Sequence, residues 1–499
     1  MEKAHRSINT VGALKESGWE SVSVKEEIRR NLILKIRNQK DLFPNIKGYD
    51  NTVIPHLQHA LLSKHDIILL GLRGQAKTKI LRQLFLLLDE YLPVLKDTEM
   101  NEDPYNPVSK HGKELLNEEK DEASVSWLHR SERYGEKLAT PDTAVSDLIG
   151  DIDPIKAAAQ KMTLADENVI NFGLVPRTNR GIFAINELPD LQPRIQVALL
   201  NIMQERDIQI RGFNVRIPLD LLMVFSANPE DYTNRGNIIT PLKDRIDSQI
   251  LTHYPQKVEV GMQITEQEAW TSRGSNVQVT VPLAFKKLLE LIAFEARSSE
   301  YIDQKSGVST RMTITAMEQL ISAAERRALT NREEQTVIRI TDIYHMIPAL
   351  TGKLELVYEG EQEGTVNVAK HIIGKAIKKI FLQLFPDPEI EKKKERDSEY
   401  KPILDWFAAG NTLDITDRQN QNQYEEKLKE IPGLQSLVKG HLAEKHAQTE
   451  LVLMDFVIEG LHQHSMLGKE EMDNHRSYSD MLGSMLGSMD DLNNTDDFD

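Results

Sequence analysis

A glycine-rich stretch that ends in lysine and threonine has the residue types and spacing for phosphate chemistry. Gly71 and Gly74 are followed by Lys77 and Thr78, and the stretch comes directly after the apolar run 67–70. This order predicts a strand that ends in a loop and continues into a helix. In such a loop, backbone N–H groups and the helix N-terminus face phosphate oxygens, lysine neutralises their charge, and the threonine hydroxyl can bind magnesium. The sequence therefore predicts a nucleoside triphosphate site.

Gln75 and Ala76 complete this loop. Ala76 stands where the pattern usually has its last glycine. A methyl group restricts the backbone but leaves the N–H donor in place, so we treat the alanine as a variant of the loop. A chance match in a solvated turn is the alternative, and the strand-to-helix context disfavours it.

Two polar residues follow a second apolar strand. Residues 181–185 lead into Asn186 and Glu187. Since phosphoryl transfer needs mainly positioning and charge stabilisation, we expect Glu187 to polarise the attacking water as the catalytic base. Asn186 stands where the corresponding strand of nucleotide-binding sheets usually carries Asp. Its amide oxygen can accept a hydrogen bond from a magnesium-bound water but adds no negative charge. The substitution therefore weakens the expectation of hydrolysis. The alternative for Glu187 is an ordinary carboxylate at the start of a helix.

A third apolar run, 221–226, is followed closely by Asn228 and a proline. An asparagine at the end of a strand beside the phosphate strand can orient the lytic water or contact the γ-phosphate. A turn-forming asparagine before proline is the alternative.

Composition excludes several classes of protein. The chain has 499 residues, 40% of them hydrophobic, no cysteine and a formal net charge of -16. Disulfides, thiolate metal sites and cysteine nucleophiles are thereby excluded, and the acidic surface argues against nucleic acid as a partner. No apolar stretch approaches the roughly 20 residues needed to cross a bilayer, and the N-terminus lacks the apolar core of a signal peptide. We expect no membrane insertion and a cytoplasmic location.

Periodicity predicts the elements that position these residues. Helices are expected at 24–36 and 53–62, before the glycine-rich loop, and at 80–92 after it. Residues 96–139 are polar and charged, which favours an insertion. Alternating residues over 207–217 predict a β-hairpin that turns at an Arg-Gly pair.

Together these motifs resemble the AAA+ ATPases of the MoxR and magnesium-chelatase motor-subunit group over roughly residues 41–385. The resemblance implies an α/β fold: an AAA+ P-loop core with a parallel sheet flanked by helices, then an α-helical lid and a small helical C-terminal domain. ATP and Mg²⁺ are the cofactors it implies.

Individual motifs carry this resemblance. The stretch Gly71 to Thr78 is similar to the Walker A loop, and residues 179–191 are similar to the Walker B strand, with Asn186 as the departure. Asn228 would be sensor 1, Arg245 the arginine finger that reaches the nucleotide of a neighbouring subunit, and Arg311 the sensor 2 residue at the start of a lid helix.

Arg245 also has a simpler interpretation. It could be a helix-surface arginine paired with Asp244 or Asp247, and no local feature of the sequence separates the two.

The resemblance and the composition shifts divide the chain into five parts. We expect an N-terminal helical segment (1–40), the nucleotide-binding core (41–256, with the insertion at about 96–139), the helical lid (257–388), a C-terminal helical domain (389–461) and a disordered tail rich in methionine and aspartate (462–499).

The function implied by the resemblance is ATP hydrolysis at the subunit interfaces of a homo-oligomeric, hexameric ring that remodels or activates a partner protein, as in MoxR-like chaperones. Members of this group often work with a protein carrying a von Willebrand A domain. The alternatives are the motor subunit of a magnesium chelatase and, because of Asn186, a nucleotide-gated scaffold with little hydrolysis. A transcriptional activator is disfavoured, since neither a convincing DNA-reading helix-turn-helix nor a basic surface is found.

Overall fold

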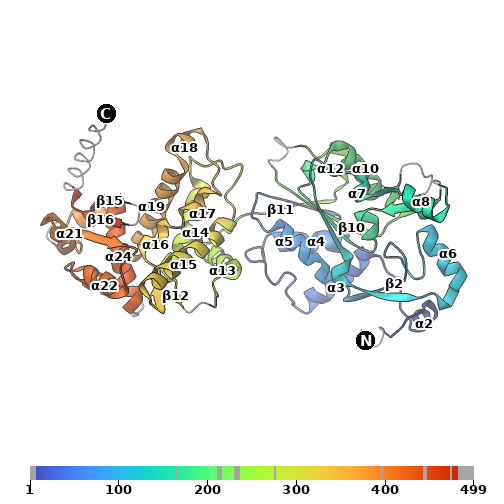
Figure 1. Cartoon of the computed structure of the whole chain (residues 1–499), viewed down its shortest axis with the longest axis horizontal. Helices are drawn as coiled ribbons and strands as arrows, with labels where there is room; N and C mark the ends of the chain where they lie inside the picture. Colours follow the sequence, from blue (N-terminus) through green and yellow to red (C-terminus); the bar gives the residue numbers. More distant parts are fainter. Residues whose placement is uncertain are drawn as a thin grey trace. The chain divides into compact units, whose positions relative to one another are not determined.

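The computed structural model describes residues 7–163, 166–210, 216–229, 236–274, 277–394, 397–441, 447–472 and 475–481. The chain divides into two compact units, Met1–Tyr254 and Pro255–Asp499, which we call unit 1 and unit 2 (Figure 1). None of the helices within these described ranges is long and apolar enough to cross a membrane.

Unit 1 is built around a five-stranded parallel sheet in the order β11-β1-β10-β7-β4. Its strands are β1 (Ile67–Leu70), β4 (Tyr134–Leu138), β7 (Gly181–Asn186), β10 (Leu221–Ala227) and β11 (Ser248–Leu251). The main helices are α2 (Val11–Glu16), α3 (Val24–Arg37), α4 (Val53–Leu62), α5 (Lys77–Gln83), α6 (Lys110–Glu119), α7 (Val145–Leu148), α8 (Pro154–Gln160), α9 (Leu174–Arg177), α10 (Pro193–Gln204) and α12 (Thr240–Arg245). Three antiparallel pairs complete it: β2 (Tyr91–Leu95) with β3 (Val125–His129), β5 (Gly150–Ile152) with β6 (Ile170–Phe172), and β8 (Asp207–Gln209) with β9 (Arg216–Pro218).

Helices cover both faces of the central sheet. Alternate residues of β1 enter different cores: Ile67 and Leu69 pack with residues of α3, α4 and α5, whereas Ile68 and Leu70 pack with residues of α10 and α12. A strand buried on both faces reads as a continuous apolar run, which is the pattern of 67–70. The expected α/β core with a parallel sheet between helices is confirmed.

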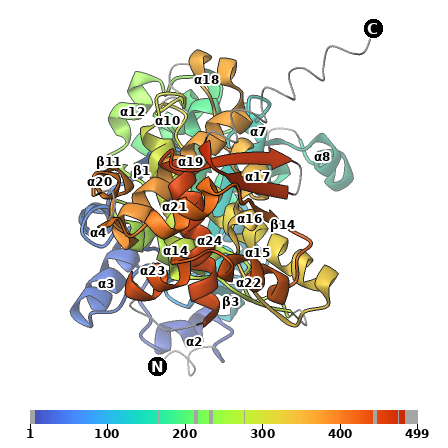
Figure 2. The same ribbon diagram turned by 90° about the vertical axis from the view of Figure 1, so that its left-hand side faces the viewer.

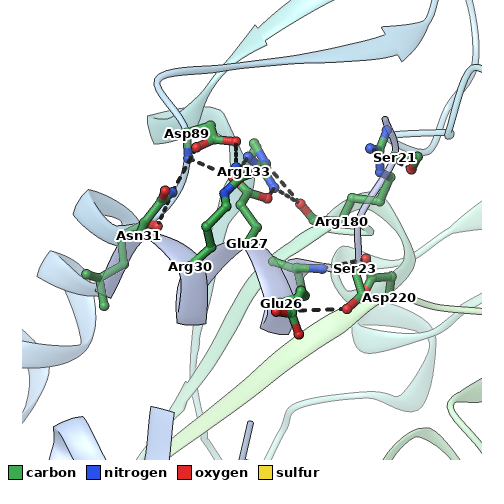
Figure 3. A network of polar contacts seen from close by, with 12 residues as sticks. Ser21, Ser23, Glu26, Glu27, Arg30, Asn31, Asp89, Arg133, Arg180 and Asp220 are labelled. Atoms are coloured by element: carbon green, nitrogen blue, oxygen red, sulfur yellow. Dashed lines mark hydrogen bonds and ion pairs between the residues drawn. The ribbon is translucent and has the colours of Figure 1, made fainter. Parts of the chain in front are cut away.

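A buried polar network attaches helix α3 to the sheet (Figure 3). The Glu27 carboxylate accepts two hydrogen bonds from Arg133, at 2.7 and 2.6 Å, and Arg133 also donates to the Arg180 carbonyl. At the first residue of α3, the Val24 N–H donates to Asp220 at 2.8 Å. Because a buried charge is tolerated only when it is paired, these contacts define how α3 meets the core.

Two elements of unit 1 differ from the sequence expectation. The helix expected over 80–92 ends as α5 at Gln83, with a 3₁₀ turn at Leu84–Leu87, and the chain enters β2 at Tyr91. The charged stretch 96–139 contains β3 and β4, and β4 pairs with β7, so its last residues belong to the core sheet and not to an insertion. The hairpin at 207–217 is present as β8 and β9, and its turn lies outside the described residues.

Unit 2 combines helices with two small sheets, and the red arrows in Figure 2 are strands of the C-terminal one. Its helices are α13 (Val258–Glu268), α14 (Leu283–Ser298), α15 (Arg311–Asn331), α16 (Ile340–Tyr344), α17 (Ile347–Thr351), α18 (Tyr358–Glu363), α19 (Thr365–Leu384), α20 (Pro388–Lys392), α21 (Lys401–Ala408), α22 (Gln421–Lys429), α23 (Leu434–His441) and α24 (Ala447–Gln463). The parallel pair is β12 (Gln278–Thr280) with β13 (Gln335–Val337); the antiparallel sheet is β14 (Leu413–Thr416), β16 (His475–Ser479) and β15 (Gly468–Met472).

The C-terminal part of unit 2 is more ordered and less purely helical than the sequence indicates. One hydrophobic core extends from Ala269 to Tyr478, and the pairs of β16 with β14 and β15 lie within the expected helical domain and tail. The loss of order expected from 462 onward is therefore wrong as far as the described residues reach, and residues 482–499 lie outside them. The expected boundary at 388 falls inside this core and stays a prediction.

Candidate functional site

The glycine-rich loop runs from the buried end of β1 to the first turn of α5. Gly71 N–H donates to the Ala227 carbonyl at 3.2 Å, so the loop starts beside the end of β10. Gly74 and Ala76 have left-handed backbones, with φ of 75° and 57°. Alternating backbone conformations of this kind turn successive N–H groups toward one side of a loop, where they can bind an anion. The alanine keeps the conformation that the usual glycine would provide, at a steric cost.

Side chains from two other segments of unit 1 hold this loop. The Thr252 hydroxyl donates to Gln75 Oε1 at 2.7 Å, and the Tyr254 hydroxyl donates to the Arg73 carbonyl at 2.9 Å. The Tyr49 hydroxyl lies 2.9 Å from the Gln75 carbonyl, and burial raises the Tyr49 pKa well above its usual range. Because the anchors bind carbonyls and a side-chain oxygen, they do not use the N–H groups of the loop.

Lys77 is buried and bends back over its own loop. Its Nζ donates to the carbonyls of Gly71 and Leu72, the latter at 3.0 Å. An ammonium group has three donors and seeks acceptors wherever it is buried. The ammonium therefore lies at the loop, where the sequence predicts that it meets phosphate.

Four oxygen-bearing side chains meet at the carboxyl edge of the sheet. Thr78 Oγ1 lies 3.4 Å from Asn186 Oδ1, and the Ser226 hydroxyl donates to the same oxygen at 2.9 Å. Asn186 Nδ2 donates to Glu136 Oε1 at 2.8 Å. Hydroxyl, amide and carboxylate oxygens are ligands of the kind that Mg²⁺ prefers, so the donor set at Thr78 and Asn186 fits that ion.

Glu136 has further partners on its outer side. Arg82 of α5 donates to both carboxylate oxygens, at 2.8 and 2.9 Å, and these hydrogen bonds raise the pKa of Arg82. The Tyr134 hydroxyl donates to Glu136 at 3.3 Å, and burial raises the Tyr134 pKa above its usual range. Glu136 belongs to no motif of the sequence, and Ser226 only ends the apolar run 221–226. Their contacts with Asn186 become visible only once β4 and β10 are paired with β7.

Glu187 follows β7 in a left-handed conformation, with φ of 55° and ψ of 48°. Its N–H donates to Ser226 Oγ at 3.4 Å, and its side chain does not cap the 3₁₀ turn that begins at Leu188. Glu187 thus stands at the start of a helical turn, as its alternative interpretation as an ordinary carboxylate expects, and its catalytic role stays a prediction.

Asn228 comes directly after β10, which lies between β1 and β7. Leu70 pairs with Ala227, and Ile185 pairs with Phe225, so the three strands end at nearly the same level. Ligands of parallel α/β sheets bind outside the carboxyl ends of the strands. Lys77, Thr78, Asn186, Glu187 and Asn228 are thus all attached to one edge of the sheet.

The two remaining arginines are on other elements. Arg245 ends α12 and donates to Gln204 Oε1 at 3.0 and 2.8 Å and to the Pro241 carbonyl, so its hydrogen bonds are not made to Asp244 or Asp247. Arg311 begins α15 in unit 2 and is exposed.

A preformed metal site of several charged ligands is not part of this constellation. Within the described ranges, no group of three or more histidine, aspartate or glutamate side chains could hold a metal ion. Mg²⁺ commonly binds proteins through one or two side chains together with nucleotide phosphates, which needs no such group.

Two curated proteins are similar to this chain in sequence. The magnesium-chelatase 38 kDa subunit of Cereibacter sphaeroides is 27% identical over 213 residues, which are 41% of this chain and 56% of that protein. Chaperone MoxR1 of Mycobacterium tuberculosis is 23% identical over 290 residues, which are 54% of this chain and 72% of that protein. The chain thus covers little more than half the length of the chelatase subunit. No family model matches the sequence.

Among solved structures, a complex of the magnesium-chelatase subunits BchI and BchD contains a similar chain. It is 19% identical, covers 64% of this chain and 98% of its own length, and has a TM-score of 0.34.

Proposed function

We propose that this chain binds ATP with Mg²⁺ and hydrolyses it. By sequence similarity it is an AAA+ protein of the group that contains MoxR chaperones and magnesium-chelatase motor subunits. The observation that carries the proposal is the meeting of Thr78 and Asn186 beside the Lys77 loop. A loop N–H nest, a buried ammonium and hard oxygen ligands at one sheet edge together suit a metal-bound triphosphate and few other ligands.

Each residue would have a distinct role. The loop N–H groups of Gly71 to Ala76 and the Lys77 ammonium would hold the phosphates, and Thr78 and Asn186 would hold the metal ion. When bound, Mg²⁺ would supply positive charge that offsets the negative charge of the phosphate oxygens. Glu187 would orient and polarise the attacking water, and Asn228 at the neighbouring strand end would contact that water or the γ-phosphate.

Two arginines would complete the site from outside the core. Arg245 is partly exposed at the end of α12 and would reach the γ-phosphate held by a neighbouring copy, which requires a ring. Arg311, exposed at the start of α15, would contact nucleotide from unit 2. The ring, which we propose to be a hexamer, would use the nucleotide cycle to remodel or activate a partner protein.

The proposal extends to partner and location. The named activities of the two relatives, a chaperone and a chelatase subunit, favour action on another protein. We propose a protein with a von Willebrand A domain as that partner and the cytoplasm as the location. The motor subunit of a magnesium chelatase remains the alternative within the group.

A steady-state phosphate-release assay tests hydrolysis. Purified full-length protein with ATP and Mg²⁺ should release phosphate, and Glu187→Gln should lower the rate by roughly two orders of magnitude or more, as for loss of a general base. Equal rates near background for both would instead favour a nucleotide-gated scaffold, for which Asn186 is the supporting observation. Mass measurement with and without Mg²⁺ and ATP tests the ring, because the proposal predicts assembly with nucleotide.

A further inference from the structure

Asn186 leaves the proposed metal site without the negative charge that an aspartate would bring. A carboxylate is nevertheless present next to it: Glu136 Oε1 accepts from Asn186 Nδ2 at 2.8 Å. Glu136 is on β4 and Asn186 is on β7, so the contact crosses two neighbouring strands.

The strand register places the two side chains on the same face. Leu138 of β4 pairs with Asn186 of β7, and Glu136 pairs with Ala184, which is two residues before Asn186 on the same strand. Side chains two residues apart on a strand share a face, so Glu136 and Asn186 are diagonal neighbours on the side of the sheet that carries Thr78. The contact follows from the register and does not depend on a loop.

Hydrogen bonding determines which way the Asn186 amide points. An ionised carboxylate only accepts, so the amide nitrogen must face Glu136. The amide oxygen then faces Ser226 and Thr78, which lie 2.9 and 3.4 Å away. Without Glu136, the amide could turn by half a rotation and present its nitrogen to the metal position, where it would repel a cation.

The contact of Glu136 with Asn186 is buried, whereas the bidentate ion pair on its outer side is open to water at the arginine. Asn186 is only 4% exposed, whereas the Arg82 side chain is 63% exposed. Water therefore screens the charge of Arg82, while a hydrogen bond between a carboxylate and a buried amide is strengthened by the carboxylate charge. Arg82 therefore offsets only part of the Glu136 charge at Asn186.

We propose that Glu136 and Asn186 together replace the missing aspartate. Glu136 is a positioning residue: it holds the amide oxygen toward Thr78 and supplies, from the next strand, negative charge that attracts the magnesium ion of bound nucleotide. This inference rests on the proposed function and adds a residue to it.

A nucleotide titration with and without Mg²⁺ tests the pair without measuring turnover. Full-length protein is titrated with an N-methylanthraniloyl derivative of ATP, first in EDTA and then at increasing Mg²⁺ concentrations. Glu136→Gln keeps the size of the side chain and removes its charge. Its Kd in EDTA should stay within about twofold of the wild-type Kd. The factor by which Mg²⁺ lowers the Kd should be about tenfold smaller than in the wild type, as expected for loss of one charge-assisted hydrogen bond.

Two further variants separate a charge effect from a loss of structure. Glu132→Gln changes an exposed residue of the 3₁₀ turn just before β4, so it removes the same charge away from Asn186 and should behave as the wild type. The double variant Glu136→Gln/Asn186→Asp, called the exchange variant, again has one carboxylate and one amide in hydrogen-bond contact. In it, the factor by which Mg²⁺ lowers the Kd should return to within about threefold of the wild-type value.

The outcomes distinguish this inference from the proposed function. An unchanged Mg²⁺ effect in Glu136→Gln, or wild-type binding that Mg²⁺ does not tighten, would overturn the role of the pair while leaving nucleotide binding in place. Failure of the exchange variant to recover, with its melting temperature unchanged, would also count against it. Absence of any nucleotide binding by the wild type would refute the proposed function itself.

Discussion

Asp455 makes the stability of unit 2 depend on pH in a direction opposite to that of most carboxylates. It lies on α24 and is 1% exposed. Its Oδ2 accepts from the Tyr424 hydroxyl at 2.8 Å and from Ile340 N–H at 3.3 Å, whereas its Oδ1 has no hydrogen-bond partner among the described residues. Burial raises the pKa of Asp455 from its ordinary value of 3.8 to about 6, more than the hydrogen bond from Tyr424 and the charge of Arg476 lower it.

The sign of the effect follows from proton binding. Asp455 has its ordinary pKa of 3.8 in the unfolded chain and a pKa of about 6 in the folded chain. Between these two pH values the folded chain keeps the proton and the unfolded chain loses it, so the folded state binds more protons. The free energy of unfolding therefore falls as pH rises through this window. A shift of this size corresponds to about 3 kcal/mol in full, of which about 2 kcal/mol is lost between pH 4.5 and 7.5.

Asp455→Asn removes this dependence, because the amide is neutral at every pH and its oxygen can accept from Tyr424. Urea unfolding of the variant and the wild type at several pH values measures the difference between their unfolding free energies. From pH 4.5 to 7.5, the wild type should lose about 2 kcal/mol more unfolding free energy than the variant, whatever the difference between the two proteins at pH 4.5.

A constant difference across this range would refute the reasoning, since it would mean that Asp455 has the same pKa in both states. A difference that moves in favour of the wild type would show that the folded pKa is lowered. Tyr424→Phe is a matched control: it removes the hydrogen bond to the Asp455 carboxylate but leaves the carboxylate buried, so its pH dependence should be at least as steep.

Three further substitutions test the loop and its support. Gly71→Ala would press a methyl group against Thr252 Oγ1, so ATP affinity should fall about tenfold in a fluorescence titration, and unchanged affinity would contradict the close packing. Ala76→Gly should raise unfolding stability by up to about 1 kcal/mol by relieving the left-handed alanine, and a lower melting temperature would speak against strain. Glu27→Gln leaves Arg133 buried without the carboxylate that neutralises it, so urea unfolding should show a loss of about 3 kcal/mol or more; a loss below about 1 kcal/mol would mean that the pair is not critical.

Local patterns were sufficient to predict the strand, loop and helix around Gly71 and the strand before Asn186. Each is a continuous apolar run that ends at glycine or polar residues, and a strand buried on both faces has that appearance in any α/β protein. The same reasoning predicted α3 and α4, whose apolar residues recur with helical spacing and pack on one face of the sheet.

The residues that support the site could not be predicted in this way. Glu136, Ser226 and Thr252 come from three different strands or strand ends, and nothing in their local sequence separates them from other polar residues. They acquire meaning only from the strand order, which a single sequence does not specify.

Tertiary pairing also explains the elements that were predicted incorrectly. Residues 84–92 are apolar enough for a helix, but 91–95 pair with 125–129 as strands, and the pairing overrides local preference. Residues 468–472 and 475–479 are mostly polar and form two short strands, yet they belong to a sheet because β16 also pairs with the distant β14.

The central claim is that the loop between β1 and α5 binds a metal-bound nucleoside triphosphate, and calorimetric titration of the full-length chain with ATP and Mg²⁺ tests it most directly. The account predicts saturable binding by the wild type and a strong loss of affinity in Lys77→Ala, whose ammonium is buried at the loop. Absence of binding by the wild type at millimolar ATP, or equal affinity in the two proteins, would contradict it.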